Sequence, residues 1–150
     1  MTIPRALQRL MSTAAAGVLV ASSLLVATPA NAATCSGTSC DGTDPASTGC
    51  SADAQNANVT DIMHNGVVVA VLELRWSPSC RTNWGRISNR VSPQNEVRVW
   101  AYRGATKTVK TRGFGQQYYS DQLYGWNMVV CAVGRVDTPA GDKIKKEVCA

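Results

Sequence analysis

The chain has 150 residues, six cysteines and a formal net charge of +5. This length suits one domain with a modest core and is short for two ordinary domains. It contains a single histidine, His64, and no Cys-x-x-Cys pair, so the usual ligand spacing of a zinc site is absent.

The first 32 residues have the organisation of an export signal. Arg5 and Arg9 give a basic start, an uncharged apolar run follows over residues 14–27, and Ala30-x-Ala32 forms a small-residue cleavage site. The run is shorter than the roughly 20 apolar residues that a membrane span needs. We therefore predict that residues 1–32 are a signal peptide, and that residues 33–150 form a single secreted, β-rich domain with no membrane span.

The cysteines of an exported chain of this size are expected to form disulfides. Six cysteines give three bridges and 15 possible pairings. Three of the six lie in residues 33–58, a stretch rich in Ser, Thr, Gly and Asp that we interpret as loops held by disulfides. The cysteines are Cys35, Cys40, Cys50, Cys80, Cys131 and Cys149.

The clearest predicted strand covers residues 66–76. Its even positions, from Val68 to Trp76, are all apolar, whereas the odd positions turn polar at Glu73 and Arg75. A strand buried on both faces at one end fits a central place in a small sheet.

A short helix is predicted directly after this strand. Ser77 is a good N-cap, and proline is favoured at the first helical position. Cys80, Trp84 and Ile87 then lie at i, i+4 and i+7, on one helical face.

Further strands are predicted over residues 95–103, 106–112, 126–136 and 143–149. Residues 106–112 suit an exposed edge because lysines discourage further pairing. Cys131 and Cys149 each lie nine residues from Ala140, so a simple hairpin would place them opposite each other as one bridge. The partner of Cys80 among the N-terminal cysteines stays open. The expected fold is a small, mainly β, sheet-like or barrel-like domain with one short helix.

The first half of the predicted mature chain resembles the YjfA-like family of small exported bacterial proteins. Trp76 stands where that family has tyrosine, and Cys131 and Cys149 are additional to its four cysteines. The resemblance implies a secreted, disulfide-bonded domain of unassigned function, and related domains on membrane proteins with a cytoplasmic DNA-binding module favour ligand sensing over catalysis. The residues that carry it are Cys35-x4-Cys40-Asp41-Gly42-Thr43-Asp44-Pro45, Gly49-Cys50, Asp53-Ala54 and Glu73-Leu74-Arg75-Trp76-Ser77-Pro78-x-Cys80-x3-Trp84.

Two chemical sites can be considered from residue types. Asp41, Asp44 and Asp53 could supply oxygen ligands to Ca²⁺, although Asp before Gly or Pro is also an ordinary turn former. No cofactor is expected beyond this calcium alternative. His64, with Glu73 and Arg75, could form the acid–base centre of a small secreted hydrolase or nuclease.

Charge favours a different function. Residues 33–74 carry five acids and no Lys or Arg, whereas residues 75–150 carry thirteen Lys or Arg and five acids. We therefore favour a non-enzymatic extracellular binding or structural module that contacts an anionic cell-envelope polymer. Nucleic acid is not the expected partner, and the oligomeric state stays open. The predicted contact residues are Arg81, Arg98, Arg103 and Lys107.

Overall fold

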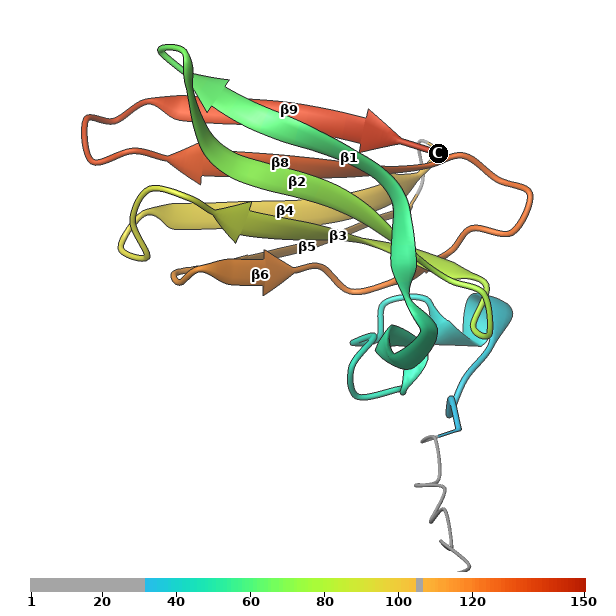
Figure 1. Ribbon diagram of the computed structural model, residues 1–150. Coiled ribbons are helices and arrows are strands. Elements are labelled where there is room, and N and C mark those ends of the chain that lie inside the picture. Colours follow the sequence, from blue (N-terminus) through green and yellow to red (C-terminus); the bar gives the residue numbers. More distant parts are fainter. Residues whose placement is uncertain (1–31, 105–106) are drawn as a thin grey trace, which may run out of the picture.

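The strands pair into two antiparallel sheets that pack face to face (Figure 1). The computed structural model describes residues 32–104 and 107–150, and the side chains of residues 107–111 lie outside this description. Residues 1–31, which hold nearly all of the predicted signal peptide, also lie outside it. The elements are η1 (Gly37–Cys40), η2 (Cys50–Asp53), β1 (Gln55–His64), β2 (Val67–Ser77), β3 (Thr82–Asn89), β4 (Glu96–Arg103), β5 (Lys107–Gly113), β6 (Gln117–Tyr119), β7 (Leu123–Tyr124), β8 (Val130–Asp137) and β9 (Lys143–Cys149).

Sheet A has the order β1-β2-β3-β6, with β7 also paired to β3, and sheet B has the order β5-β4-β8-β9. The two sheets meet along one edge, where the side chain of Asn58 on β1 donates a hydrogen bond to the carbonyl of Cys149 on β9 at 2.9 Å. Within the described residues they do not close into a barrel. The fold is therefore mainly β, as predicted.

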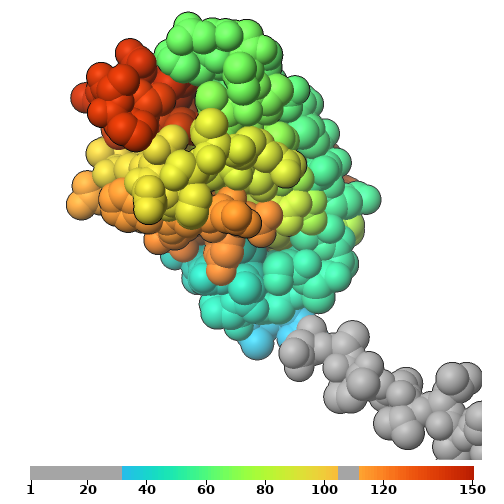
Figure 2. Space-filling view, turned by 60° about the vertical axis from the view of Figure 1, so that its left-hand side comes forward, coloured from blue at the N-terminus to red at the C-terminus, as the bar shows by residue number. Residues whose placement is uncertain are grey.

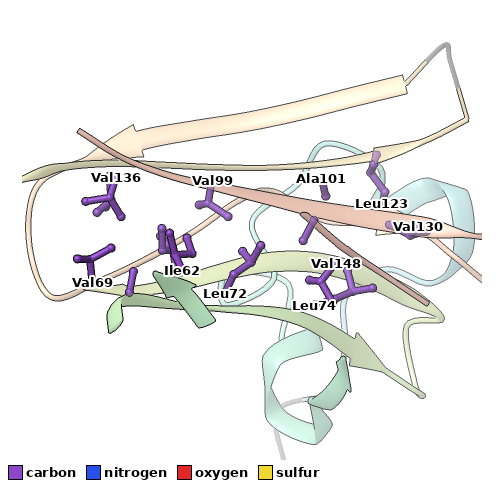
Figure 3. Packing of buried hydrophobic residues seen from close by; sticks show 14 residues of the cluster. Ile62, Val69, Leu72, Leu74, Val99, Ala101, Leu123, Val130, Val136 and Val148 are labelled. Atoms are coloured by element: carbon purple, nitrogen blue, oxygen red, sulfur yellow. The ribbon is translucent and has the colours of Figure 1, made fainter. Parts of the chain in front are cut away.

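Buried aliphatic side chains from the two sheets fill the space between them (Figure 3). Leu72 and Ile87 of sheet A, with Val99 of sheet B, are completely buried. Two glycines allow the sheets to approach closely: a Cβ on Gly85 would lie 2.7 Å from Val99 Cγ2, and one on Gly134 would lie 3.0 Å from Leu72 Cδ1. The core thus depends on small residues as well as large ones.

The predicted helix after Ser77 is wrong. The amide of Arg81 donates to the carbonyl of Ser77 at 2.8 Å, Arg81 takes a positive φ of 58°, and the chain turns back as β3. Trp84 and Ile87 consequently point to opposite faces of a strand, as period-2 alternation requires. Among the described residues, the only helical elements are the short 3-10 turns η1 and η2.

Besides β3, three further strands were not predicted. In β1 most side chains are exposed and Ile62 is the one fully buried residue, so the strand shows no apolar alternation. The short strands β6 and β7 lie in residues 113–125, for which no strand was predicted. The predicted strand over residues 126–136 begins only at Val130, after an exposed loop in which Asn127 has a φ of 57°.

The disulfide pairing is Cys35–Cys40, Cys50–Cys80 and Cys131–Cys149. The last bridge joins directly opposed residues of β8 and β9, which confirms the hairpin prediction. Cys50–Cys80 ties the β2–β3 turn to residues 32–54, which we call the N-terminal segment.

The N-terminal segment lies at one end of the sandwich (Figure 1). Figure 2 shows the opposite end, where the β8–β9 hairpin (red), the β1–β2 hairpin (green) and the β3–β4 connection (yellow) gather. The candidate sites described next lie on the outer faces of the two sheets.

Candidate functional site

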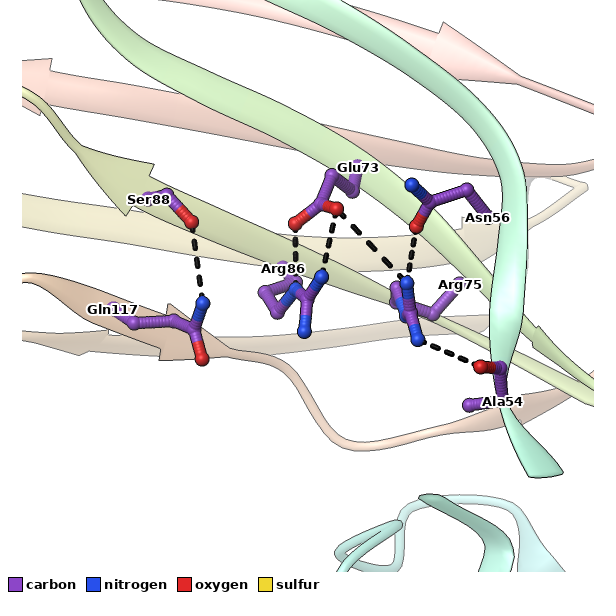
Figure 4. A network of polar contacts seen from close by, with 7 residues as sticks. All are labelled: Ala54, Asn56, Glu73, Arg75, Arg86, Ser88 and Gln117. Atoms are coloured by element: carbon purple, nitrogen blue, oxygen red, sulfur yellow. Dashed lines mark hydrogen bonds and ion pairs between the residues drawn. The ribbon is translucent and has the colours of Figure 1, made fainter. Parts of the chain in front are cut away.

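A charged network lies on the outer face of sheet A (Figure 4). Alternation along β2 and β3 turns Glu73, Arg75 and Arg86 away from the core, and Glu73 and Arg86 are direct cross-strand partners. Arg86 donates two hydrogen bonds to the Glu73 carboxylate, at 2.5 and 2.7 Å. Arg75 donates to the side chain of Asn56 and, at 2.8 Å, to the carbonyl of Ala54.

This network shifts the ionisation of its members. Hydrogen bonds from Arg86 lower the pKa of Glu73, against the opposing effect of burial, and raise the pKa of Arg86 itself. Burial, followed by the charge of Arg86, lowers the pKa of Arg75. Glu73 is only 8% exposed and already has a bidentate partner, so its carboxylate is a structural anion rather than a free general base.

The network lines a hollow of about 240 Å³ between sheet A and the N-terminal segment. Arg75 and Arg86 form one part of its wall, Trp84 and Tyr119 another, and the backbone around Pro45 closes it from the N-terminal segment. A second hollow, of about 270 Å³, adjoins it and shares Gln117 and Tyr119 with it.

Two carboxylates face the second hollow, those of Asp44 and Asp121. Burial, and then the charge of Asp44, raise the pKa of Asp121. Burial, the charge of Asp44 and a hydrogen bond to Asp44 raise the pKa of Tyr119 in turn. In the described part of the chain, no Lys or Arg lies within ion-pair distance of either carboxylate.

The outer face of sheet B carries a line of basic residues. Four basic residues, one from each strand, are cross-strand neighbours in a single line, which we call the basic row: Arg112, Arg98, Arg135 and Lys145. The residue pattern within each strand did not reveal the basic row, because the row depends on the register between all four strands.

Acidic neighbours neutralise the middle of the basic row. Arg98 Nε lies 2.6 Å from a carboxylate oxygen of Glu96, and Arg135 makes hydrogen bonds of 2.7 and 2.8 Å to Asp137. The outer members, Arg112 and Lys145, are exposed.

Aromatic side chains lie beside the basic row. Lys145 Nζ is 5.8 Å from the ring centroid of Trp100, within the range of a cation–π contact. On the same face, a hydrogen bond to Glu147 raises the pKa of Tyr102.

Two of the other predicted contact residues, Arg103 and Arg81, do not join this face. Arg103 bonds Asp41 at 3.1 Å and the carbonyl of Tyr124 at 2.9 Å, so it is paired internally and does not lie beside Arg98 as a free contact residue. The guanidinium of Arg81 lies 5.1 Å from the ring centroid of Trp126, which in turn stacks on Trp76. Lys107 begins β5, and its side chain is outside the described atoms.

His64 and Glu73 are not brought together. His64 ends β1, and its Nε2 lies 3.5 Å from Asp142 at the hairpin end. Glu73 pairs with Val59, five residues from His64 along the same strand. At the usual rise per residue this corresponds to about 16 Å. The proposed acid–base centre of His64, Glu73 and Arg75 is therefore not assembled in this structure.

The three aspartates considered for calcium also serve separate purposes. Asp41 pairs with Arg103, and Asp53 accepts hydrogen bonds from the Ser77 hydroxyl at 2.6 Å and the Ser79 amide at 2.8 Å. Asp44 accepts the amides of two following residues, at 2.7 and 3.0 Å. Over residues 32–104 and 107–150, no group of metal-ligating side chains contains any of them.

Among the described residues there is no helix with the length and apolar character of a membrane span.

Comparison with known proteins places the chain in a family. No curated protein and no solved structure matches the chain. The narrower YjfA-like assignment stays a prediction. The family model described as "Protein of unknown function (DUF2690)" matches residues 38–134, and the chain belongs to this family.

Proposed function

We propose that the protein is a non-enzymatic extracellular binding module that holds an anionic polymer of the cell envelope against the outer face of sheet B. The observation that carries this proposal is the basic row. Directly opposed side chains on neighbouring strands have Cβ atoms about 5 Å apart, and like charges there destabilise a sheet. The cations of the basic row therefore repel one another where acidic side chains do not offset them, and an anionic ligand would neutralise the charge that remains at Arg112 and Lys145.

The charge balance of the face supports an anionic ligand. Glu96 and Asp137 compensate the two central arginines, whereas Arg112 and Lys145 remain exposed at the ends of the row. Three inter-strand steps separate those ends, which is about 14 Å. A linear polyanion lying across the strands could contact both ends at once and rest on the ring of Trp100.

The three disulfides support an extracellular setting, because disulfides are rare in reducing compartments such as the cytosol. For the enzyme alternative, a hydrolase or nuclease using His64, the only acidic group within ion-pair distance of that histidine among the described residues is the exposed Asp142. Binding is therefore the better supported of the two.

The test is retention of the oxidised protein by its own cell-envelope fraction over a series of salt concentrations. Binding through the basic row should fall at least tenfold between about 50 and 200 mM salt. The double variant Arg112→Gln, Lys145→Gln should bind several-fold more weakly and show a flatter salt dependence.

A matched control is Arg81→Gln with Arg90→Gln, which removes the same charge from exposed positions away from sheet B. The control should bind like the unaltered protein. No retention at low salt, or an equal loss in both double variants, would contradict the proposal. If the protein instead cleaves the polymer and His64→Ala stops the cleavage, the enzyme alternative replaces it.

A further inference from the structure

The two hollows beside sheet A adjoin each other, and we treat them together as one groove, the sheet A groove. They share Gln117 and Tyr119, which therefore stand at the junction. One wall is the strand pair β3–β6 and the other is the N-terminal segment. The groove lies on the other sheet from the basic row, so it is independent of the function proposed above.

One end of the groove can accept an anion. A guanidinium has five N–H groups in a fixed planar arrangement. The described hydrogen bonds use two of those of Arg86, toward Glu73, and two of those of Arg75, toward Asn56 and Ala54. Two guanidiniums share a single carboxylate here, which leaves one positive charge and several unused donors on two residues that line the hollow.

The other end can accept a cation. Asp44 is held in place by hydrogen bonds from the amides of Ala46 and Ser47 to its Oδ1 atom. Asp121 is half-buried beside it, and the pKa of Asp121 is raised by burial and by the charge of Asp44. An ammonium group between the two carboxylates would favour the ionised form of Asp121 against burial and the charge of Asp44.

The distance between the ends sets the size of the ligand. Tyr119 is the cross-strand partner of Arg86, and Asp121 follows Tyr119 by two residues. Directly opposed residues of antiparallel strands lie about 5 Å apart and two residues of extended chain span at most about 7 Å, so the backbone positions of Arg86 and Asp121 are at most about 12 Å apart. A peptide of two or three extended residues spans about 7–10 Å, and the side chains at the two ends cover the remainder. The ring of Tyr119, 38% exposed, offers an apolar surface midway along the groove.

We propose that the sheet A groove binds a short peptide of two or three residues with free termini, its carboxylate at Arg75 and Arg86 and its ammonium group at Asp44 and Asp121. The opposite charges at the two ends distinguish this ligand from others. A polyanion would meet the two carboxylates, and a bare cation would gain nothing from the arginines.

The experiment is equilibrium dialysis of the oxidised protein against a mixture of di- and tripeptides with free termini, read out by mass spectrometry. Two parallel mixtures carry the same sequences with N-acetylated or C-amidated termini. We expect a subset of the free peptides to be retained, and either cap to lower the retention of that subset at least tenfold.

The variant Asp121→Asn tests the ammonium end. Ionisation of Asp121 is already opposed by burial, so this variant should fold normally. It should weaken binding of the free peptides at least tenfold while leaving the weak retention of the N-acetylated peptides unchanged. The control Asp61→Asn, which alters an exposed carboxylate on β1, should bind like the unaltered protein.

Retention of free and capped peptides to the same extent, or of none, would overturn the proposal. Equal weakening of free and N-acetylated peptides by Asp121→Asn would also overturn it, because that result would show general distortion of the groove. The variant Arg112→Gln, Lys145→Gln should keep peptide binding, so a failure of the polymer proposal would be seen separately.

Discussion

The N-terminal segment and the sandwich are stabilised by different interactions. The sandwich buries a continuous set of aliphatic side chains between its sheets. The N-terminal segment buries mainly Cys40 and Cys50, which pack with Cys80 in a small separate cluster. Burial of aliphatic area is the dominant favourable term in folding, and the segment has little of it.

Directional polar contacts attach the segment to the sandwich instead. The amide of Gln122, which is fully buried, donates to the hydroxyls of Thr43 and Thr48 at 3.0 and 2.8 Å. Its carbonyl oxygen accepts a hydrogen bond of 2.7 Å from Thr82 on β3. Asp41 bonds Arg103 and, at 2.6 Å, the amide of Tyr124.

This difference has a consequence for the sheet A groove. One wall of the groove belongs to the sandwich and the other to the segment, so the shape of the groove depends on the weaker attachment. Changes in the core should lower global stability, whereas changes in the polar contacts should open the groove locally.

The largest effect should come from the core. Leu72→Ala removes a fully buried side chain that packs against both sheets, and we expect a loss of about 3–5 kcal/mol in the free energy of unfolding. Denaturant titration followed by tryptophan fluorescence measures it. Val67→Ala is the control, because Val67 lies on the same strand with 58% of its surface exposed, and should change stability little.

The second-largest loss of stability should follow removal of the disulfide that joins the N-terminal segment to the β2–β3 turn. Cys50–Cys80 closes a loop of 30 residues, and its removal should destabilise the chain by roughly 3–4 kcal/mol. In Cys50→Ala, Cys80→Ala we expect limited proteolysis to cut first within residues 32–54 while the sheets stay protected. Simultaneous loss of both regions would show that they unfold as one unit.

The sandwich could be predicted from sequence to a greater extent than the segment. Alternation identified β2 and β4, because Leu72 and Val99 face a core that the pattern itself implies. The symmetric spacing about Ala140 was enough to predict Cys131–Cys149. Neither signal exists in residues 32–54, where few apolar side chains are present to alternate.

The errors have definite causes. The spacing of Cys80, Trp84 and Ile87 matches a helix, but a turn and the close approach of Gly85 to sheet B favour a strand. The basic row and the sheet A groove bring together residues distant in the chain. Arg112 and Lys145, or Asp44 and Asp121, become neighbours only through strand register and loop placement, which residue types alone do not specify.

A smaller effect is expected at Gln122. Gln122→Leu keeps the volume of the side chain but removes a hydrogen-bond partner from the buried hydroxyls of Thr48 and Thr82. We expect this to lower the free energy of unfolding by about 1–3 kcal/mol. Hydrogen exchange should increase at the amides of residues 41–49 and change little in β8. Equal increases in both places would contradict a local attachment.

The smallest and most specific effect concerns Glu73 and pH. Its pKa is lowered in the folded protein by hydrogen bonds from Arg86, so its contribution to stability is full above its unfolded pKa and is lost as pH falls through the folded pKa. Stability should therefore decline from about pH 4.5 downward. Glu73→Gln should be less stable than the unaltered protein at pH 7, where Arg86 loses its charged partner, and the two should converge as the pH falls through the lowered pKa of Glu73. The raised pKa of Asp121 changes stability with pH in the opposite direction, but it does so equally in both proteins. It therefore cancels in the difference between their stabilities. Thermal unfolding of both proteins at several pH values measures this difference, and a gap that stays constant with pH would show that the carboxylate is not a charged partner of Arg86.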